Sequence, residues 1–196
     1  MNKIGLVLMA TIVALTISAG RVNAQDGPVT VGVKAGVNLS TLDGDVKHTK
    51  SVFKYQFGIT ADIALSNNLY VMTGLDLQTK GTKSKSDIKY NPMYIQLPAH
   101  LGYKFSLSPS VKFVVNAGPY VAYGIGGKVK GDGNNEKIFG NNKFKKLDYG
   151  VGGGIGFEIS KLCINGGYDF GLNDISDMKD VKVKNRNAYV TLGYKF

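Results

Sequence analysis

The chain has 196 residues, 26 of them glycine, with a formal net charge of +10, one cysteine and no tryptophan. This length suits one domain, and a lone cysteine, Cys163, excludes an internal disulfide. A basic composition can indicate nucleic-acid binding. Because the N-terminus indicates export, we expect no nucleic-acid partner and favour anionic lipid or lipopolysaccharide phosphates. The alternative is a solvated basic surface that keeps the loops soluble.

The first 24 residues have the pattern of a secretory signal peptide. A basic start, MNK, precedes an apolar run at 4–19, and Val22 and Ala24 occupy the −3 and −1 positions of a signal-peptidase site. The apolar run is too short for a good membrane span, although an uncleaved anchor is the alternative. We therefore expect residues 1–24 to be a signal peptide and residues 25–196 to form an exported domain.

After this leader, eight segments alternate apolar residues with small or polar ones. The first, VTVGVKAGVNLS, is apolar at every odd position. Each segment has roughly ten residues or more, which suits a tilted strand crossing a bilayer, whereas soluble strands average about 5–6 residues. The expected strands are 29–40, 53–65, 69–80, 93–105, 111–127, 147–159, 162–172 and 188–196.

The connections between these strands alternate in length. The tight turns are 66–68, 106–110 and 160–161. The long polar connections are 41–52, 81–89, 129–146 and 174–185. Short periplasmic turns, long external loops and both termini in the periplasm are typical of outer-membrane barrels. The expected fold is therefore all-β, an eight-stranded antiparallel up-and-down transmembrane β-barrel. Pro98 and Pro119 fall inside strands and predict bulges or bends there.

The apolar face could point inward to a ligand, as in a lipocalin-like barrel, or outward to lipid. The aromatic residues of this face favour lipid, because they gather near both strand ends around an aliphatic middle, as two bilayer interfaces require. Near the long loops lie Phe53, Tyr55, Tyr123, Tyr149, Tyr168 and Phe170. Near the tight turns lie Tyr103, Phe105, Phe113, Phe157, Tyr194 and Phe196.

The opposite face combines charges of both signs with many glycines. Its polar residues include Lys34, Lys54, Asp62, Asp76, Gln96, His100, Lys104, Lys112, Asn116, Glu158, Asn165 and Asp169. The interior of an eight-stranded barrel is just wide enough for side chains. We therefore expect a hydrogen-bonded plug of ion pairs rather than a pore, with glycines that allow curvature or close packing.

Four stretches together resemble the PorT-like outer-membrane β-barrel family of Bacteroidota. They are MYIQLPAHLGYKF, VNAGPYVAYGIGGK, LDYGVGGGIGFEI and VTLGYKF, in this order along the chain. The resemblance covers about residues 29–196 and implies an eight-stranded barrel in the outer membrane. PorT itself is linked to protein secretion, but no residue ties this chain to that role. The closing Leu192, Tyr194 and Phe196 are similar to the C-terminal signal read by the outer-membrane assembly machinery.

No pattern of catalytic, metal or cofactor chemistry stands out. The two histidines are His48, in a long loop near Asp43 and Asp45, and His100, on the polar face. Both fit structural or solvated roles better than acid–base catalysis. The glycine run at 150–156 alternates along a strand and is not a phosphate-binding loop. We therefore expect no enzyme activity, no metal and no cofactor.

The basic loops are the remaining candidates for binding. One lies at 80–90 and carries Lys80, Lys83, Lys85 and Lys89, and the other, at 128–146, is the longest loop and is also basic. Their lysines are expected to contact lipopolysaccharide phosphates at the outer rim, with simple solvation as the alternative. The expected function is that of an integral outer-membrane structural or interaction protein with four external loops. A narrow porin-like channel and a component of a protein secretion system are the alternatives. A third class is an enzyme on lipid or peptide, which substitution of His48 and His100 would test.

Overall fold

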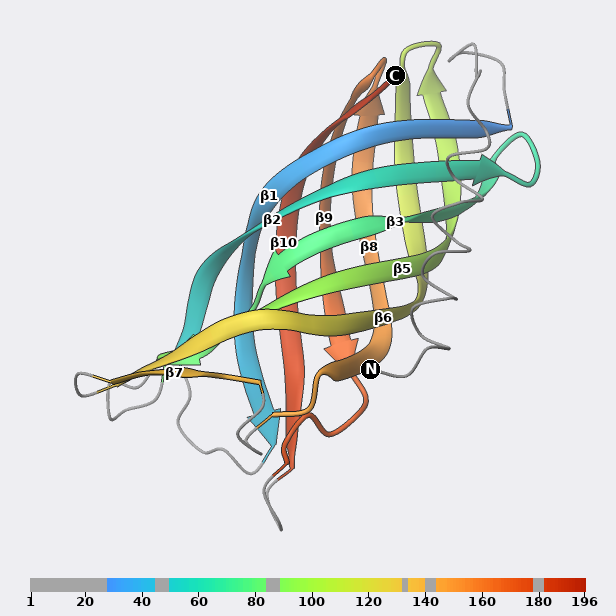
Figure 1. The fold of residues 1–196 in the computed structure, drawn as a ribbon. Helices are drawn as coiled ribbons and strands as arrows, with labels where there is room; N and C mark the ends of the chain where they lie inside the picture. The colour runs from blue at the N-terminus through green and yellow to red at the C-terminus, as the bar shows by residue number, and fades with distance from the viewer. Residues whose placement is uncertain (1–27, 45–49, 84–88, 132–133, 140–143, 178–181) are drawn as a thin grey trace.

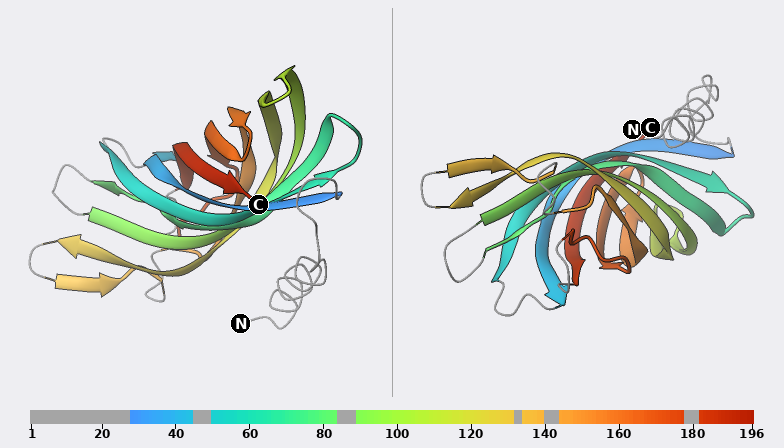
Figure 2. Two further views of the ribbon diagram at one scale, coloured as in Figure 1. Left: turned by 90° about the horizontal axis from the view of Figure 1, so that it is seen from above. Right: turned by 60° about the horizontal axis from the view of Figure 1, so that its bottom comes forward.

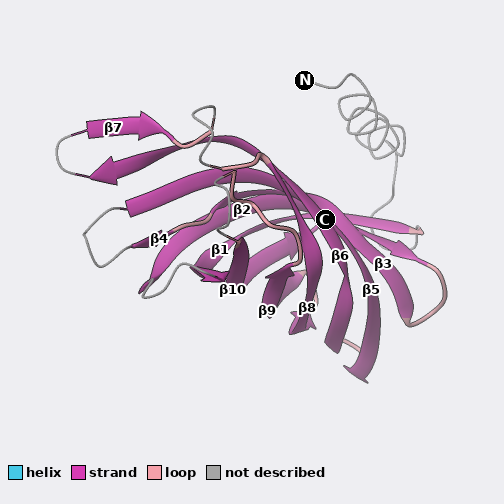
Figure 3. Ribbon diagram, turned by 90° about the horizontal axis from the view of Figure 1, so that it is seen from below, coloured by secondary structure: helices cyan, strands magenta, loops and turns pink. Residues whose placement is uncertain are grey.

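The computed structural model describes residues 28–44, 50–83, 89–131, 134–139, 144–177 and 182–196. The expected signal peptide lies outside the described residues. Strands and loops make up the described part (Figure 3). Among these residues, no helix combines the length and the apolar character that crossing a membrane requires.

Eight long strands form one closed antiparallel sheet. They are β1 (Val29–Gly44), β2 (Lys50–Ala64), β3 (Leu69–Thr79), β5 (Lys89–Ser108), β6 (Val111–Gly131), β8 (Leu147–Ile159), β9 (Leu162–Gly171) and β10 (Val183–Lys195). Two short strands are added to this sheet: β4 (Thr82–Lys83) pairs with β2 and β5, and β7 (Asn134–Lys137) pairs with β6. The long strands pair in the order β1-β2-β3-β5-β6-β8-β9-β10, and β10 pairs with β1 (Figures 1 and 2). This closure confirms the expected eight-stranded barrel.

The two ends of the barrel differ as expected. One end, called the turn end, carries the tight connections β2–β3, β5–β6 and β8–β9, and the other, the loop end, carries the long connections. Strands β5 and β6 have 20 and 21 residues, and at the loop end they pair with β4 and β7. These extensions were not expected, because strand pairing continues there through polar segments without alternation.

Burial is inverted relative to a water-soluble protein. Large apolar side chains such as Ile59 and Leu192 are 55% and 64% exposed, while Asp148 and Asn187 are fully buried. Alternate residues of a strand point to opposite faces, so each strand presents one apolar and one polar side. The apolar side lies outside and the polar side fills the interior, as the aromatic positions predicted.

The two prolines interrupt hydrogen bonding without shifting the register. The β5–β6 pairing stops after Pro98 and resumes at Leu101 in the same register, and the register shifts lie elsewhere, at Met93/Tyr94 and Ser106/Ser108. Bulges or bends were expected at Pro98 and Pro119, and the register shows no bulge at either proline. Proline removes one ladder donor, and the ladder tolerates this loss locally. The carbonyl oxygen of Pro98 accepts a hydrogen bond from Thr73 Oγ1 at 2.7 Å.

The outward face predicts a depth-dependent response to charge. Val190 lies on the outer face between the level of Tyr168, beside Ala188, and that of Tyr194. Val190→Arg is expected to lower the free energy of unfolding in lipid vesicles by about 2–4 kcal/mol, because it places a charge near the midplane. Leu107→Arg, at the exposed turn end, is expected to cost only about 0–1 kcal/mol. Equal costs measured by urea unfolding would contradict a lipid-facing surface.

Candidate functional site

The interior at the turn end is closed by a four-residue ion cluster. Lys104 Nζ lies 2.6 Å from Asp62 Oδ2 and 3.0 Å from Glu158 Oε1. Lys195 pairs with the same two carboxylates. The four side chains come from β2, β5, β8 and β10, which are spread around the wall. The cluster therefore crosses the interior and leaves its charges mutually compensated.

The interior toward the loop end contains a second, fully buried ion pair. Lys80 Nζ lies 3.0 Å from Asp148 Oδ2, and neither side chain is exposed to solvent. Asn185 Nδ2 donates to the same carboxylate oxygen at 2.8 Å. The Lys80 ammonium also lies 5.2 and 5.0 Å from the ring centres of Tyr94 and Tyr120. This cation is thus satisfied by a carboxylate and two aromatic faces.

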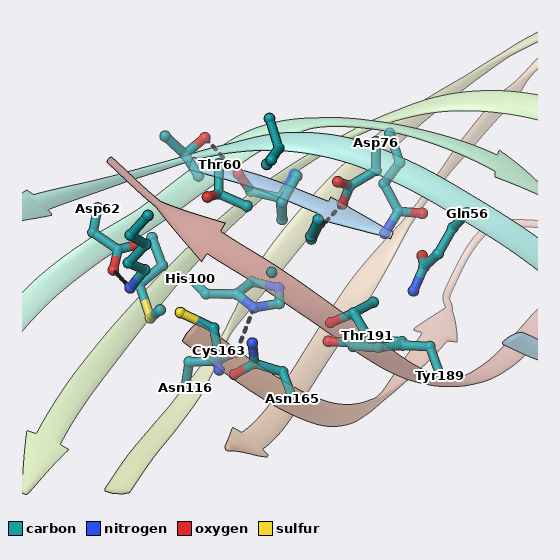
Figure 4. Close-up of a pocket in the computed structure, with 18 of the residues that line it drawn as sticks. Gln56, Thr60, Asp62, Asp76, His100, Asn116, Cys163, Asn165, Tyr189 and Thr191 are labelled. Atoms are coloured by element: carbon teal, nitrogen blue, oxygen red, sulfur yellow. Dashed lines mark hydrogen bonds and ion pairs between the residues drawn. The ribbon is translucent and has the colours of Figure 1, made fainter. Parts of the chain in front are cut away.

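Between these clusters lies a small polar cavity of about 90 Å³ (Figure 4). On its walls, Lys34 pairs with Asp76 at 2.9 Å, and His100 Nδ1 lies 2.8 Å from Asn116 Oδ1. Asp169 accepts a hydrogen bond from Gln96 Nε2 at 3.1 Å. A cavity of this size has room for a few water molecules only.

Glycines of the wall make room for these polar side chains. A Cβ atom built on Gly152 would lie 2.4 Å from Asp169 Oδ1 and 3.3 Å from His100 Nε2. A Cβ on Gly58 would lie 2.1 Å from Asp76 Oδ1. Any larger residue would displace these charged groups, which supports the expected role of glycines in close packing of the interior.

A hydrophobic cluster, here called the cap, lies at the loop end. Its buried members are Leu42, Ile138, Phe144, Ile175 and Val183. They come from β1, from β10 and from the connections before β8 and before β10, so the cap joins four separate segments of the chain. Phe139 joins the cap to the Lys80 site, because its ring packs edge-on against Tyr94 with centroids 5.6 Å apart.

One carboxylate holds the connection between β9 and β10. Asp174 Oδ1 accepts the backbone N–H groups of Ser176 and Val183 at 2.9 and 2.8 Å. Burial acts to raise the pKa of Asp174, but these N–H donors and the Lys145 ammonium hold that pKa below its usual value. A lowered pKa contributes stability at neutral pH that is lost as the pH falls through it.

Comparison with known proteins agrees with this architecture. A family model described as outer membrane protein β-barrel domain matches residues 23–177. The chain belongs to this family. It is therefore a protein of the bacterial outer membrane. A comparison with curated protein sequences gives no match.

Two solved structures show the same fold at low identity. Neisserial surface protein A is 16% identical, and the match covers 85% of this chain and 97% of that one with a TM-score of 0.52. The outer membrane enzyme PagL is 14% identical, with 83% of this chain and 98% of that one covered and a TM-score of 0.54. At these identities the similarity concerns the barrel itself.

The expected binding lysines do not form one external patch. Lys80 is enclosed in the interior and paired with Asp148, so the contact with lipopolysaccharide expected for Lys80 is wrong. Lys85 and the side chains of Lys83 and Lys89 lie outside the described residues.

The other expected residues are found in several places. Leu192, Tyr194 and Phe196 lie on the exposed outer face of the closing strand. His100 lines the interior cavity, while His48 and Asp45 lie outside the described residues.

Two further sets of residues were not predicted to form clusters. Lys195 and Asp148 complete the ion clusters, and both occupy positions whose alternation already places them inside. The cap has no comparable signal, because its residues are isolated apolar positions in polar segments. In the described part of the chain, no group of three or more acidic, histidine or cysteine side chains could hold a metal ion.

The buried pair predicts a large and recoverable loss of stability. Lys80→Met leaves Asp148 buried without its ammonium partner and is expected to lower the free energy of unfolding by about 3–5 kcal/mol. The double variant Lys80→Met/Asp148→Leu is expected to recover most of that loss, because no uncompensated charge remains. Urea unfolding in vesicles measures both.

A matched control is the exposed pair Lys145–Asp174, whose charged atoms are 3.6 Å apart. Lys145→Met is expected to cost about 0–1 kcal/mol. If Lys80→Met cost no more than this control, the buried pair would not be closing the interior as described.

Proposed function

We propose that this protein is a closed, non-conducting outer-membrane barrel that acts as a structural or interaction protein through its outer surface. The observation that carries the proposal is the fully buried Lys80–Asp148 pair beneath the cap. Ions that traverse a pore need a continuous aqueous path, and this pair occupies the interior that such a path requires. Function then resides on the loops and the lipid-facing wall.

A narrow porin-like channel is the competing function. It would need the turn-end cluster, the Lys80 site and the cap to open together, because each closes the interior at a different level. The cavity of about 90 Å³ between them is too small for solutes to pass through it. The packing of the described residues therefore favours a closed barrel over a channel.

Electrical measurement separates these two functions. The protein reconstituted in a planar lipid bilayer is expected to show no stable conductance steps, at low or high salt. Insertion is verified in the same preparation by the different gel migration of boiled and unboiled samples. Regular steps that increase with salt would establish a channel and overturn the closed-barrel proposal.

Other roles remain as weaker proposals with less support in this chain. PagL is an outer membrane enzyme, but the similarity at 14% identity concerns the fold, and His100 lies inside the barrel. A PorT-like role in secretion rests on the sequence resemblance alone. Contact of Lys83, Lys85 and Lys89 with lipopolysaccharide is a proposal about side chains outside the described part of the structure. Recognition of Leu192, Tyr194 and Phe196 by the assembly machinery is supported by their exposed position on the closing strand.

A further inference from the structure

A groove of about 720 Å³ lies at the loop end, where β2, β5 and β6 pass the end of β3. It is called the rim groove here. Its apolar lining residues are Tyr55, Met93, Ile125 and Phe139. Tyr55 and Ile125 are each about half exposed on the apolar, outward side of their strands. The rim groove is therefore accessible from the lipid side of the barrel wall.

Three lysines from different segments of the chain line the rim groove. They are Lys54 of β2, Lys128 of β6 and Lys146, which directly precedes β8. Lys128 and Lys146 are exposed, while Lys54 Nζ donates to the side chain of Asn91. No acidic residue is among the described lining residues. The rim groove thus combines concentrated positive charge with an apolar surface.

The floor of the rim groove is open at Gly126. A Cβ built on Gly126 meets no atom within 4 Å, whereas a Cβ on the neighbouring Gly124 would lie 2.3 Å from the Phe139 ring. The space beside Gly126 is therefore not filled by any residue that the structure describes. A Cβ atom at this position would therefore meet no described part of the barrel.

The rim groove lies at the height of the loop-end aromatic residues. Tyr55 lines it, and Lys146 Nζ lies 5.9 Å from the ring centre of Tyr123. Such aromatic rings sit at the level of lipid headgroups in outer-membrane barrels. At this level, a ligand that matches lysines above an apolar wall has an anionic head and a hydrocarbon tail.

We propose that the rim groove binds the phosphorylated headgroup of an outer-leaflet glycolipid. Lys128 and Lys146 contact its phosphate, and the start of an acyl chain packs against Tyr55 and Ile125. Ammonium groups form strong charge-assisted hydrogen bonds with phosphate, and each lysine near an anionic lipid surface strengthens binding. This site is independent of the closed interior, so the conductance measurement does not test glycolipid binding.

Binding is tested with the folded protein in detergent micelles, titrated with fluorescently labelled diphosphorylated lipid A. The variant Lys128→Gln/Lys146→Gln is expected to bind it roughly thirtyfold more weakly, because two lysine contributions are lost. The control Lys112→Gln/Lys161→Gln removes the same charge at the turn end and is expected to bind like the original protein. Lipid A stripped of its phosphates is expected to bind the original protein as weakly as the groove variant binds the phosphorylated form.

A steric variant tests the groove without altering its charge. Gly126→Leu is expected to weaken binding by blocking the floor. Gly166→Leu is its control, because the nearest atom to a Cβ built on Gly166 is 3.7 Å away, at ordinary contact distance, on a different part of the wall. Gel migration of unboiled samples verifies that each variant is folded.

Three results would overturn the proposal. One is unchanged affinity of Lys128→Gln/Lys146→Gln, and another is an equal loss in the turn-end control. The third is equal binding of phosphorylated lipid A and lipid A without its phosphates. The rim groove would then bind acyl chains and not the phosphorylated headgroup. Each of these results is independent of whether the barrel conducts ions.

Discussion

The need to satisfy every backbone N–H and C=O group within hydrocarbon governs this structure. Lipid offers these groups no hydrogen bonds, so a sheet that crosses the membrane must have no free edge. The pairing of β10 with β1, from Gly32 opposite Lys195 to Gly44 opposite Val183, removes that edge. Once the sheet is closed, every second side chain must point into a narrow interior. The alternation of each strand and the inverted burial both follow from this closure.

Charged groups in that interior are stable because they compensate one another. Removing a carboxylate or an ammonium from water is costly, and the cost is offset only where an opposite charge lies at contact distance. Asp62 and Glu158 receive two ammonium groups from β5 and β10, and Asp148 receives one from the segment that follows β3. Each of these contacts joins segments that are not neighbours in the sheet. The ion pairs therefore connect non-adjacent parts of the wall through the interior.

The transmembrane part of this fold could be predicted because lipid imposes a strict period of two on its strands. The ends of β5 and β10 were misjudged, since segments outside the hydrocarbon, such as 89–92 and 183–187, pair without an apolar face. Lys80 shows two signals in conflict: alternation placed it on the polar side of its strand, whereas the run of lysines after it indicated a loop. The structure follows the alternation. The cap and the rim groove could not be predicted, because each joins residues that only the closed barrel brings together.

The ion cluster at the turn end also has a consequence for the order of assembly. Lys195 pairs with Asp62, which lies 133 positions earlier in the chain. Contacts between residues so distant in sequence form late, after the entropy of closing a long loop has been lost. Until β10 arrives, the carboxylates of β2 and β8 face an unfinished wall with only part of their compensation. An incomplete barrel would therefore be penalised in hydrocarbon, which favours concerted closure over stepwise insertion of its hairpins.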